Sequence, residues 1–150
     1  MRYDLASPEW QLMQKTANTL VTRALSSGIA SLTPDERTFY LVWIAEGEVG
    51  NGGMHAVCYN STGDHLPDLP NAFVALGAPK KAALFRRLIA SFGHDPPSSD
   101  HEVRLKQHAS LPESSVVEIN SLDDAFYSSE DVNEQLYSLA HKIRSSQGDA

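Results

Sequence analysis

The chain has 150 residues, of which 41% are hydrophobic and 21% charged, and this indicates a single globular domain, residues 1–150, with its own core. Nineteen acids against 12 Lys and Arg give a formal net charge of −7. This charge argues against direct binding of nucleic acid through its phosphates and favours a basic protein partner. A single cysteine excludes an internal disulfide. The first ten residues show no signal-peptide pattern, and no apolar run is long enough to span a membrane. We therefore expect a cytoplasmic protein.

Two helix starts are recognisable in the first part of the chain. Ser7 is a good N-cap and Pro8 suits the first helical position, which predicts an N-terminal helix. Thr33 and Glu36 form a capping box, which predicts a second helix start. The apolar segment that follows is rich in residues that prefer strands. We nevertheless interpret Phe39–Ala45 as a central buried helix, because the capping box precedes it.

The segment Glu46–Asp64 contains a cluster of glycines and raises the question of whether it is a ligand loop or a bend. Asn51 is a good N-cap, and Gly52 and Gly53 allow the backbone to turn sharply and to approach another backbone segment. We therefore predict a short helix that begins at these residues and ends near Gly63 in a left-handed conformation.

Functional interpretations of the same glycine-rich segment have weaker support. A phosphate loop would need a Gly-Lys-Ser/Thr ending, which is missing. Glu46, Glu48 and His55 could form a metal site, although their spacing matches no known ligand motif. Cys58 would need an activating base to act as a nucleophile and is better explained as packing. We expect no catalysis, no cofactor and no metal.

The middle of the chain alternates loops and helices. Residues 61–71 predict a loop or a very short helix, and residues 80–92 predict a helix that Gly93 ends. Residues 93–100 are a candidate hinge, and Asp100–His108 predicts a polar helix.

The C-terminal part is less clear from the sequence. Val116–Ile119 could be a short extended piece, and Ser121–Asp124 has the pattern of a helix start. Ser128 or Ser129 is expected to start the last helix, and residues 145–150 are expected to fray.

Several ordered motifs resemble a bacterial DNA-mimic protein family, a DMP-like domain of unknown function with an NGG motif. They comprise "ER" at Glu36–Arg37, Tyr40, "VGNGGMHAVCYNSTGD" at Val49–Asp64, "ALGAPKKAALFRRL" at Ala75–Leu88 and "LDDAFY" at Leu122–Tyr127. From these motifs we predict a structural role for Glu36, Arg37, Tyr40, Asn51, Gly52, Gly53, Asn60, Gly63 and Gly77. The resemblance implies an all-α fold, no known catalysis and an acidic surface that occupies a DNA-binding protein.

Taken together, these observations predict one compact all-α domain of about seven to nine helices around a central buried helix. Residues 1–32 would form the N-terminal helix, residues 33–144 the family-like core and residues 145–150 a frayed tail.

The acids are unevenly distributed, since a stretch of the C-terminal half carries acids and no Lys or Arg. Its members are Glu113, Glu118, Asp123, Asp124, Glu130, Asp131 and Glu134. They are candidates for a partner-binding face that imitates the phosphates of DNA. Alternatively, those in the first turns of predicted helices would only complement the helix dipoles.

Three functions remain open from the sequence. The first is a non-enzymatic acidic protein that inhibits a basic partner, either a DNA-binding transcriptional regulator or a nuclease-like toxin for which it would be the immunity protein. The second is a helical interaction module that binds through an apolar groove, and the third is a small metal-dependent enzyme. The sequence also leaves homodimer formation open.

Overall fold

The computed structural model describes residues 4–148, which fold into seven α-helices and two 3₁₀-helices without a strand. The helices are α1 (Pro8–Ser27), η1 (Ile29–Ser31), α2 (Pro34–Tyr59), η2 (Ser61–Asp68), α3 (Leu69–Leu76), α4 (Pro79–Ala90), α5 (His101–Ala109), α6 (Glu113–Tyr127) and α7 (Asn133–Ser146). The predicted all-α class is confirmed. Asp149 and Ala150, in the tail that was expected to fray, lie outside the described residues.

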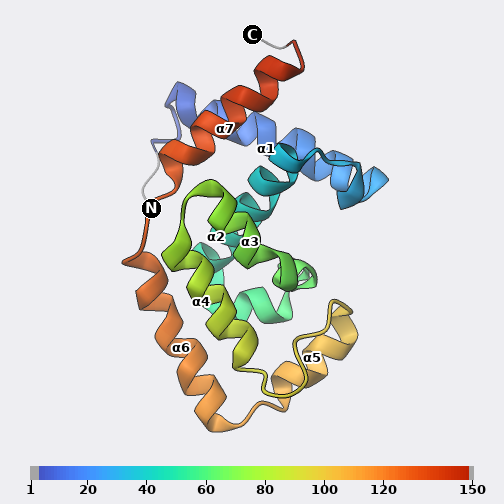
Figure 1. Ribbon diagram of the computed structural model, residues 1–150, viewed down its shortest axis with the longest axis vertical. Coiled ribbons are helices and arrows are strands. Elements are labelled where there is room, and N and C mark those ends of the chain that lie inside the picture. The colour runs from blue at the N-terminus through green and yellow to red at the C-terminus, as the bar shows by residue number, and fades with distance from the viewer. Residues whose placement is uncertain (1–3, 149–150) are drawn as a thin grey trace.

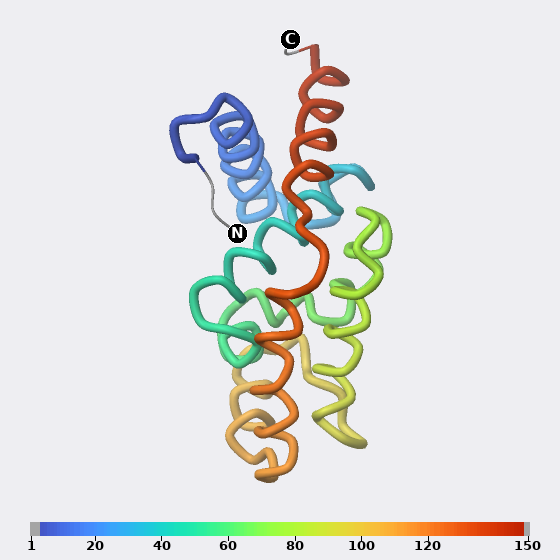
Figure 2. Tube along the Cα trace, turned by 90° about the vertical axis from the view of Figure 1, so that its left-hand side faces the viewer, coloured from blue at the N-terminus to red at the C-terminus, as the bar shows by residue number. Residues whose placement is uncertain are grey.

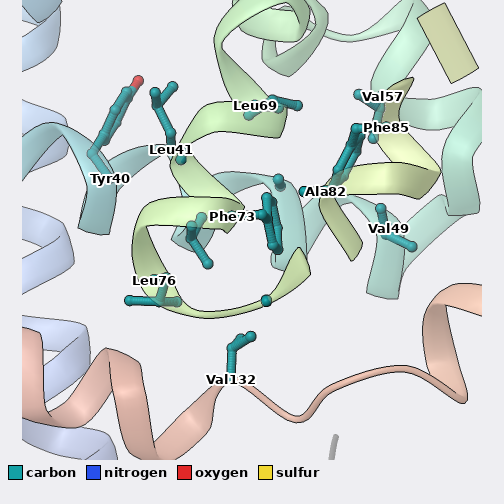
Figure 3. Packing of buried hydrophobic residues seen from close by; sticks show 14 of the residues in the cluster. Tyr40, Leu41, Val49, Val57, Leu69, Phe73, Leu76, Ala82, Phe85 and Val132 are labelled. Atoms are coloured by element: carbon teal, nitrogen blue, oxygen red, sulfur yellow. The ribbon is translucent and has the colours of Figure 1, made fainter. Parts of the chain in front are cut away.

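Helix α2 is the centre of the fold and packs against α1, α3, α5, α6 and α7. The molecule is elongated (Figure 1): α1 and α7 lie together at one end of its long axis, and α5 lies towards the other. Figure 2 shows α6 and α7 following each other along this axis. In the core (Figure 3), Phe73 of α3 packs against Phe85 of α4 with 5.0 Å between their ring centroids, and Val132 points inwards from the α6–α7 connection.

The central helix begins as the capping box predicts. The Glu36 N–H donates to the Thr33 hydroxyl at 3.2 Å, and the Thr33 N–H donates to the Glu36 carboxylate at 2.9 Å. Glu36 also binds Arg23 of α1 at 2.8 Å and Gln147 beyond α7 at 2.9 Å, so one buried carboxylate joins three elements. Phe39 and Ala45 are fully buried within the helix, which confirms helix over strand.

The bend in α2 lies at Gly53 rather than at Asn51, so the predicted N-cap is wrong. Gly53 has φ 74° and ψ −170°, which interrupts the helical backbone. The carboxylate of Asp123 in α6 replaces the predicted cap and accepts the Met54 N–H at 2.8 Å. A Cβ at Gly53 would meet Asp123 Oδ2 at 2.5 Å. The glycine therefore allows the close approach of a side chain, not of another backbone segment as predicted.

The short helical segment after the bend, Met54–Tyr59, ends before Gly63. Gly63 lies inside η2 without a left-handed φ, contrary to the prediction. A Cβ there would clash with the Val57 carbonyl and with the guanidinium of Arg104 from α5. Gly63 is thus needed because two buried groups lie against it, and not to end a helix.

Other helix boundaries are confirmed in part. Ser7 caps α1, Asp100 caps α5, and Gly93 has φ 77° in the turn after α4. Gly77, with φ 92°, ends α3.

Helix α6 contradicts two of the predictions for the C-terminal half. It is continuous from Glu113 to Tyr127 and absorbs both the predicted extended piece and the predicted helix start at Ser121–Asp124. The reason is tertiary: Ile119, Leu122 and Phe126 form one buried stripe at helical spacing.

The last helix begins and ends later than predicted. It starts at Asn133, because the fully buried Val132 holds the connection against the core. It continues through Ser146, so the first residues of the predicted frayed tail are helical.

Candidate functional site

The acid-only segment, Glu113 to Glu134, contains α6, the α6–α7 connection and the start of α7. It follows the long axis of the molecule (Figure 2). The contacts of its carboxylates divide them into two groups.

Three of the seven predicted binding acids bind other helices of the chain. Asp123 caps the Met54 N–H, as described above. Glu130 accepts the backbone N–H groups of Lys80 at 2.8 Å and Lys81 at 3.0 Å, and so caps the N-terminus of α4. Partial burial raises the pKa of Glu130, but these N–H groups outweigh it and leave the pKa below its usual value. Glu118 forms an exposed ion pair with Arg87 of α4 at 2.8 Å.

The other four acids, Glu113, Asp124, Asp131 and Glu134, are exposed. None takes part in the ion pairs found within residues 4–148. Glu113 and Asp124 are eleven residues apart, which is about three helical turns, so both lie on the outward side of α6. Asp131 follows in the connection, where it accepts its local Asn133 N–H at 2.9 Å. These four residues are called the exposed acids below.

The basic helix α4 faces this segment and is partly neutralised. Lys81 is 4% exposed and its ammonium lies 2.6 Å from the carboxylate of Glu46 in α2. The same ammonium lies 4.2 Å from the centre of the Phe126 ring, a cation–π contact. The pair takes two charges out of water, so its net contribution to stability is small although loss of one partner would be costly.

A cavity of about 490 Å³ opens beside this buried pair, between α1, α2, α4, α6 and the α6–α7 connection. Its charged lining consists of Glu46, Lys81, Glu130 and Asp131. Burial raises the pKa of Glu46, Lys81 lowers it in part, and nearby Asp131 raises it again.

Apart from Asn51 and Leu136, the remaining lining of the cavity consists of aromatic side chains and glycine backbone. Trp10 and Trp43 pack with 5.3 Å between ring centroids, and Gly47 and Gly50 of α2 contribute bare backbone. On the other wall, Tyr127 donates its hydroxyl to the Val49 carbonyl at 2.7 Å. The cavity thus combines aromatic surface with carboxylates, and one of them, Asp131, is an exposed acid.

The alternative metal site does not assemble. Glu46 binds Lys81, Glu48 binds Asn60, and His55 Nδ1 lies 2.7 Å from His108 Nε2. No group of three or more potential ligand residues converges within residues 4–148. Cys58 is fully buried, and this burial raises the pKa of its thiol to about 12. In the structure, Cys58 therefore packs in the core, where a thiolate is disfavoured.

The most important residue that sequence reasoning missed is Arg104. It is 0% exposed and donates to the carbonyls of Cys58 at 2.6 Å and Asn60 at 2.9 Å, and to the Asp64 carboxylate at 2.8 Å. A lone arginine in a polar helix gave no signal, because these three partners lie forty or more residues away in sequence. Asn60 and Gly63 of the family motif line its site, so this part of the motif is structural.

Comparison with known families identifies the family of this chain. The sequence profile of the DMP19-like protein family matches residues 30–145, which include every helix from α2 to α6 and most of α7. The chain belongs to the DMP19-like protein family. DMP19 denotes DNA mimic protein 19, so the family suggested by the motifs is confirmed. No curated protein and no solved structure matches the chain.

The matched region of this DMP19-like chain contains all seven acids of the acid-only segment, and most of the cavity lining. Trp10 of α1 lies before it. Among residues 4–148, none of the helices has the length and apolar character needed to cross a membrane.

Proposed function

We propose that this DMP19-like protein works without catalysis, by placing its exposed acids against the DNA-binding face of a basic protein such as a transcriptional regulator. The observation that carries the proposal is that Glu113, Asp124, Asp131 and Glu134 are all exposed within one acid-only segment of a member of a DNA-mimic family. The segment that contains them has no Lys or Arg to neutralise them. Occupation of the partner's DNA-binding face would prevent it from binding DNA.

The physical basis is electrostatic complementarity. A protein that binds DNA presents Lys and Arg at positions that meet phosphates. Carboxylates spaced along one side of another protein attract the same groups and speed association at low salt. Each exposed pair contributes only about 0–1 kcal/mol, so affinity depends on several acids together.

The proposal distinguishes the acidic residues that would bind a partner from those that stabilise the fold. Neutralisation of Asp123 or Glu130 would remove helix caps, so loss of binding in such a variant would be uninformative. The informative variant is Glu113→Gln, Asp124→Asn, Asp131→Asn and Glu134→Gln together, because these side chains cap no helix of another segment. The net charge would change from −7 to −3, since four negative charges are removed.

A matched control removes the same charge elsewhere. Glu9, Asp68, Asp95 and Glu102 are also exposed and lie outside the acid-only segment. Their amide variant has the same net charge of −3, obtained by the same subtraction of four negative charges. Any difference in binding between the two variants therefore reports where the acids lie, not how many there are.

The experiment is capture of partners from the native host with the parent and both variants as baits, followed by affinity measurements in increasing salt. We expect the parent and the control to retain a basic partner, whose affinity falls steeply with salt, and the four-acid variant to lose it. Retention of the partner by the four-acid variant, without salt dependence, would contradict the proposal. It would favour binding through an apolar surface such as exposed Val117 and Tyr127 on α6.

The identity of the captured partner decides between regulation and toxin immunity. A DNA-binding regulator would support the proposal as stated, whereas a nuclease would favour the immunity alternative. Homodimer formation stays a prediction, and light scattering of the purified protein measures it directly.

A further inference from the structure

The cavity lined by Asp131, one of the exposed acids, suggests how a partner could be recognised beyond its overall charge. We infer that this cavity receives an arginine side chain of the basic partner, an inference that rests on the proposed function. Three features of the cavity carry it: its charge, its open space and its aromatic lining.

The charge of the lining favours a cation. Among the described residues that line the cavity, Glu46, Glu130 and Asp131 contribute three carboxylates and Lys81 one ammonium. Lys81 is already paired with Glu46 at 2.6 Å, and Glu130 is bound by backbone N–H groups of α4. Asp131 is exposed, and within residues 4–148 its carboxylate accepts one local N–H, that of Asn133, which leaves lone pairs available for a cation.

The first part of α2 adds to the negative potential. The helical backbone is interrupted at Gly53. The cavity is lined by Gly50 and Asn51, which belong to the last helical turn before this interruption. The carbonyl end of a helix carries a partial negative charge that stabilises cations. The sequence from Glu46 to Gly53 contains no Lys, Arg or other cationic side chain to satisfy it.

Two glycines keep the cavity open. Gly47 and Gly50 are three residues apart in α2, so they lie on the same side of the helix. A Cβ at either position would meet nothing within 4 Å. Alanine is a better helix former than glycine and would fit there without a clash. These glycines are therefore not explained by packing of the chain itself, and they leave bare backbone where another group can approach.

The aromatic lining suits a guanidinium better than an ammonium. Trp10 and Trp43 lie together on one side and Tyr127 on another. A guanidinium is planar, stacks on aromatic faces and binds a carboxylate through two N–H groups, whereas an ammonium is a compact, strongly hydrated charge. Arginine could therefore stack on an indole and bind Asp131 at the same time.

The direct test is an NMR titration with N-acetyl-arginine amide. Trp10 and Trp43 are the two tryptophans of the chain and both line the cavity, so their indole N–H signals report on it. We expect saturable shifts of these signals. N-acetyl-citrulline amide has nearly the same shape without the charge, and N-acetyl-lysine amide has the charge without the planar group. Both should bind at least about tenfold more weakly.

A cavity-filling variant supplies the structural control. Gly47→Leu places a side chain into the cavity and should weaken binding of the arginine probe at least about tenfold while the protein stays folded. Ala83→Leu adds the same side chain on the exposed side of α4 and should bind as the parent does. Thermal unfolding of both variants verifies the fold; if Gly47→Leu unfolds, Asp131→Asn takes its place in the titration.

The outcomes separate this inference from the proposed function. No saturable shift, equal binding of citrulline or lysine, or full binding by the cavity variants would overturn the arginine site. The proposed function would still stand if the four-acid variant loses its partner. If the arginine probe binds as expected but the four-acid variant keeps its partner, the proposed function fails and the link between the cavity and that partner is overturned.

Discussion

Asp123 and Asp124 are neighbours in the sequence, but only one of them holds the fold together. Asp123 reaches from α6 to the Met54 N–H at the bend of α2, whereas Asp124 is exposed to solvent. Glu130 and Asp131 repeat the contrast, because Glu130 caps α4 and Asp131 contacts its own turn. In both places, two neighbouring acidic residues that carry the same charge have different functions in the structure.

This comparison shows why the charge of a segment is a poor guide to its binding surface. A carboxylate that accepts N–H groups from another helix is fixed in place, and its charge is balanced by the helix dipole. An exposed carboxylate keeps its charge available to a partner. The acid-only segment thus combines two systems, and the following predictions separate them in order of decreasing expected effect.

The largest effect is expected for Arg104, which binds backbone carbonyls at the C-terminal end of the short helical segment Met54–Tyr59. Asp123 caps the other end of the same segment. Arg104→Met should destabilise the protein by about 3–5 kcal/mol, because the carbonyls of Cys58, Asn60 and Ser98 would lose their donor and the half-buried Asp64 carboxylate its cation. Urea unfolding measures the change. The matched control, exposed Arg86→Met, should stay within about 0.5 kcal/mol. A loss below about 1 kcal/mol for Arg104→Met would contradict its structural importance.

The contact between Gly53 and Asp123 is the second prediction. Gly53→Ala should lower the free energy of unfolding by about 1–3 kcal/mol, through a strained backbone and a clash. Asp123→Ala should lower it by about 1–3 kcal/mol as well, through loss of a helix cap. The double variant should lose less than the sum, because removal of the carboxylate relieves the clash. Asp124→Ala should change stability by less than about 0.5 kcal/mol. Additive losses would show that the two residues act independently.

The third prediction compares Glu130 with Asp131. Glu130→Ala should destabilise by about 1 kcal/mol, because the first N–H groups of α4 would lose their acceptor and the helix dipole its anion. Asp131→Ala should cost about 0.5 kcal/mol or less, since its bond is local and exposed. Chemical unfolding of both single variants tests the difference. A reversed order would mean that the cap on α4 is not important for stability.

The smallest effect is the pH dependence that Glu130 contributes. Burial raises the pKa of Glu130, but the backbone N–H groups of Lys80 and Lys81 lower it more. The pKa therefore lies below its ordinary value of 4.5. The folded protein therefore binds this proton more weakly than the unfolded chain does. The stabilisation is fully present above pH 4.5 and is lost as the pH falls through the lower folded pKa. Glu130→Gln should reduce the slope of stability against pH in this range, measured by unfolding at a series of pH values. An unchanged slope would assign the pH dependence to other acids.

Much of the fold could be predicted from local patterns. The capping box of Thr33 and Glu36 was enough to identify a helix in a segment with strand preference, because the cap bonds are made between residues three apart. The Ser7 and Asp100 caps are equally local. The same local reasoning was wrong for Ser121–Asp124, because the pattern of a helix start also occurs within a helix whose buried stripe continues through it.

The candidate site was predicted only in part. The acid-only composition between Glu113 and Glu134 was visible, but the division of its acids was not, since the Met54 N–H lies 69 residues from Asp123. The cavity could not be predicted either, because Trp10, Lys81 and Asp131 come from three distant parts of the chain.

By itself, the sequence determined the all-α class, the main helix starts, the family motifs and the excess of acid in one segment, because these depend on spacing within a few residues or on composition. Only the tertiary structure decided that Gly53 and Gly63 accommodate Asp123 and Arg104, and that Glu130 caps α4. It also decided which acids remain exposed. The physical reason is that a carboxylate's function depends on the N–H groups or cations that lie within hydrogen-bond distance of it. Those neighbours are brought together by packing of helices that are far apart in the chain.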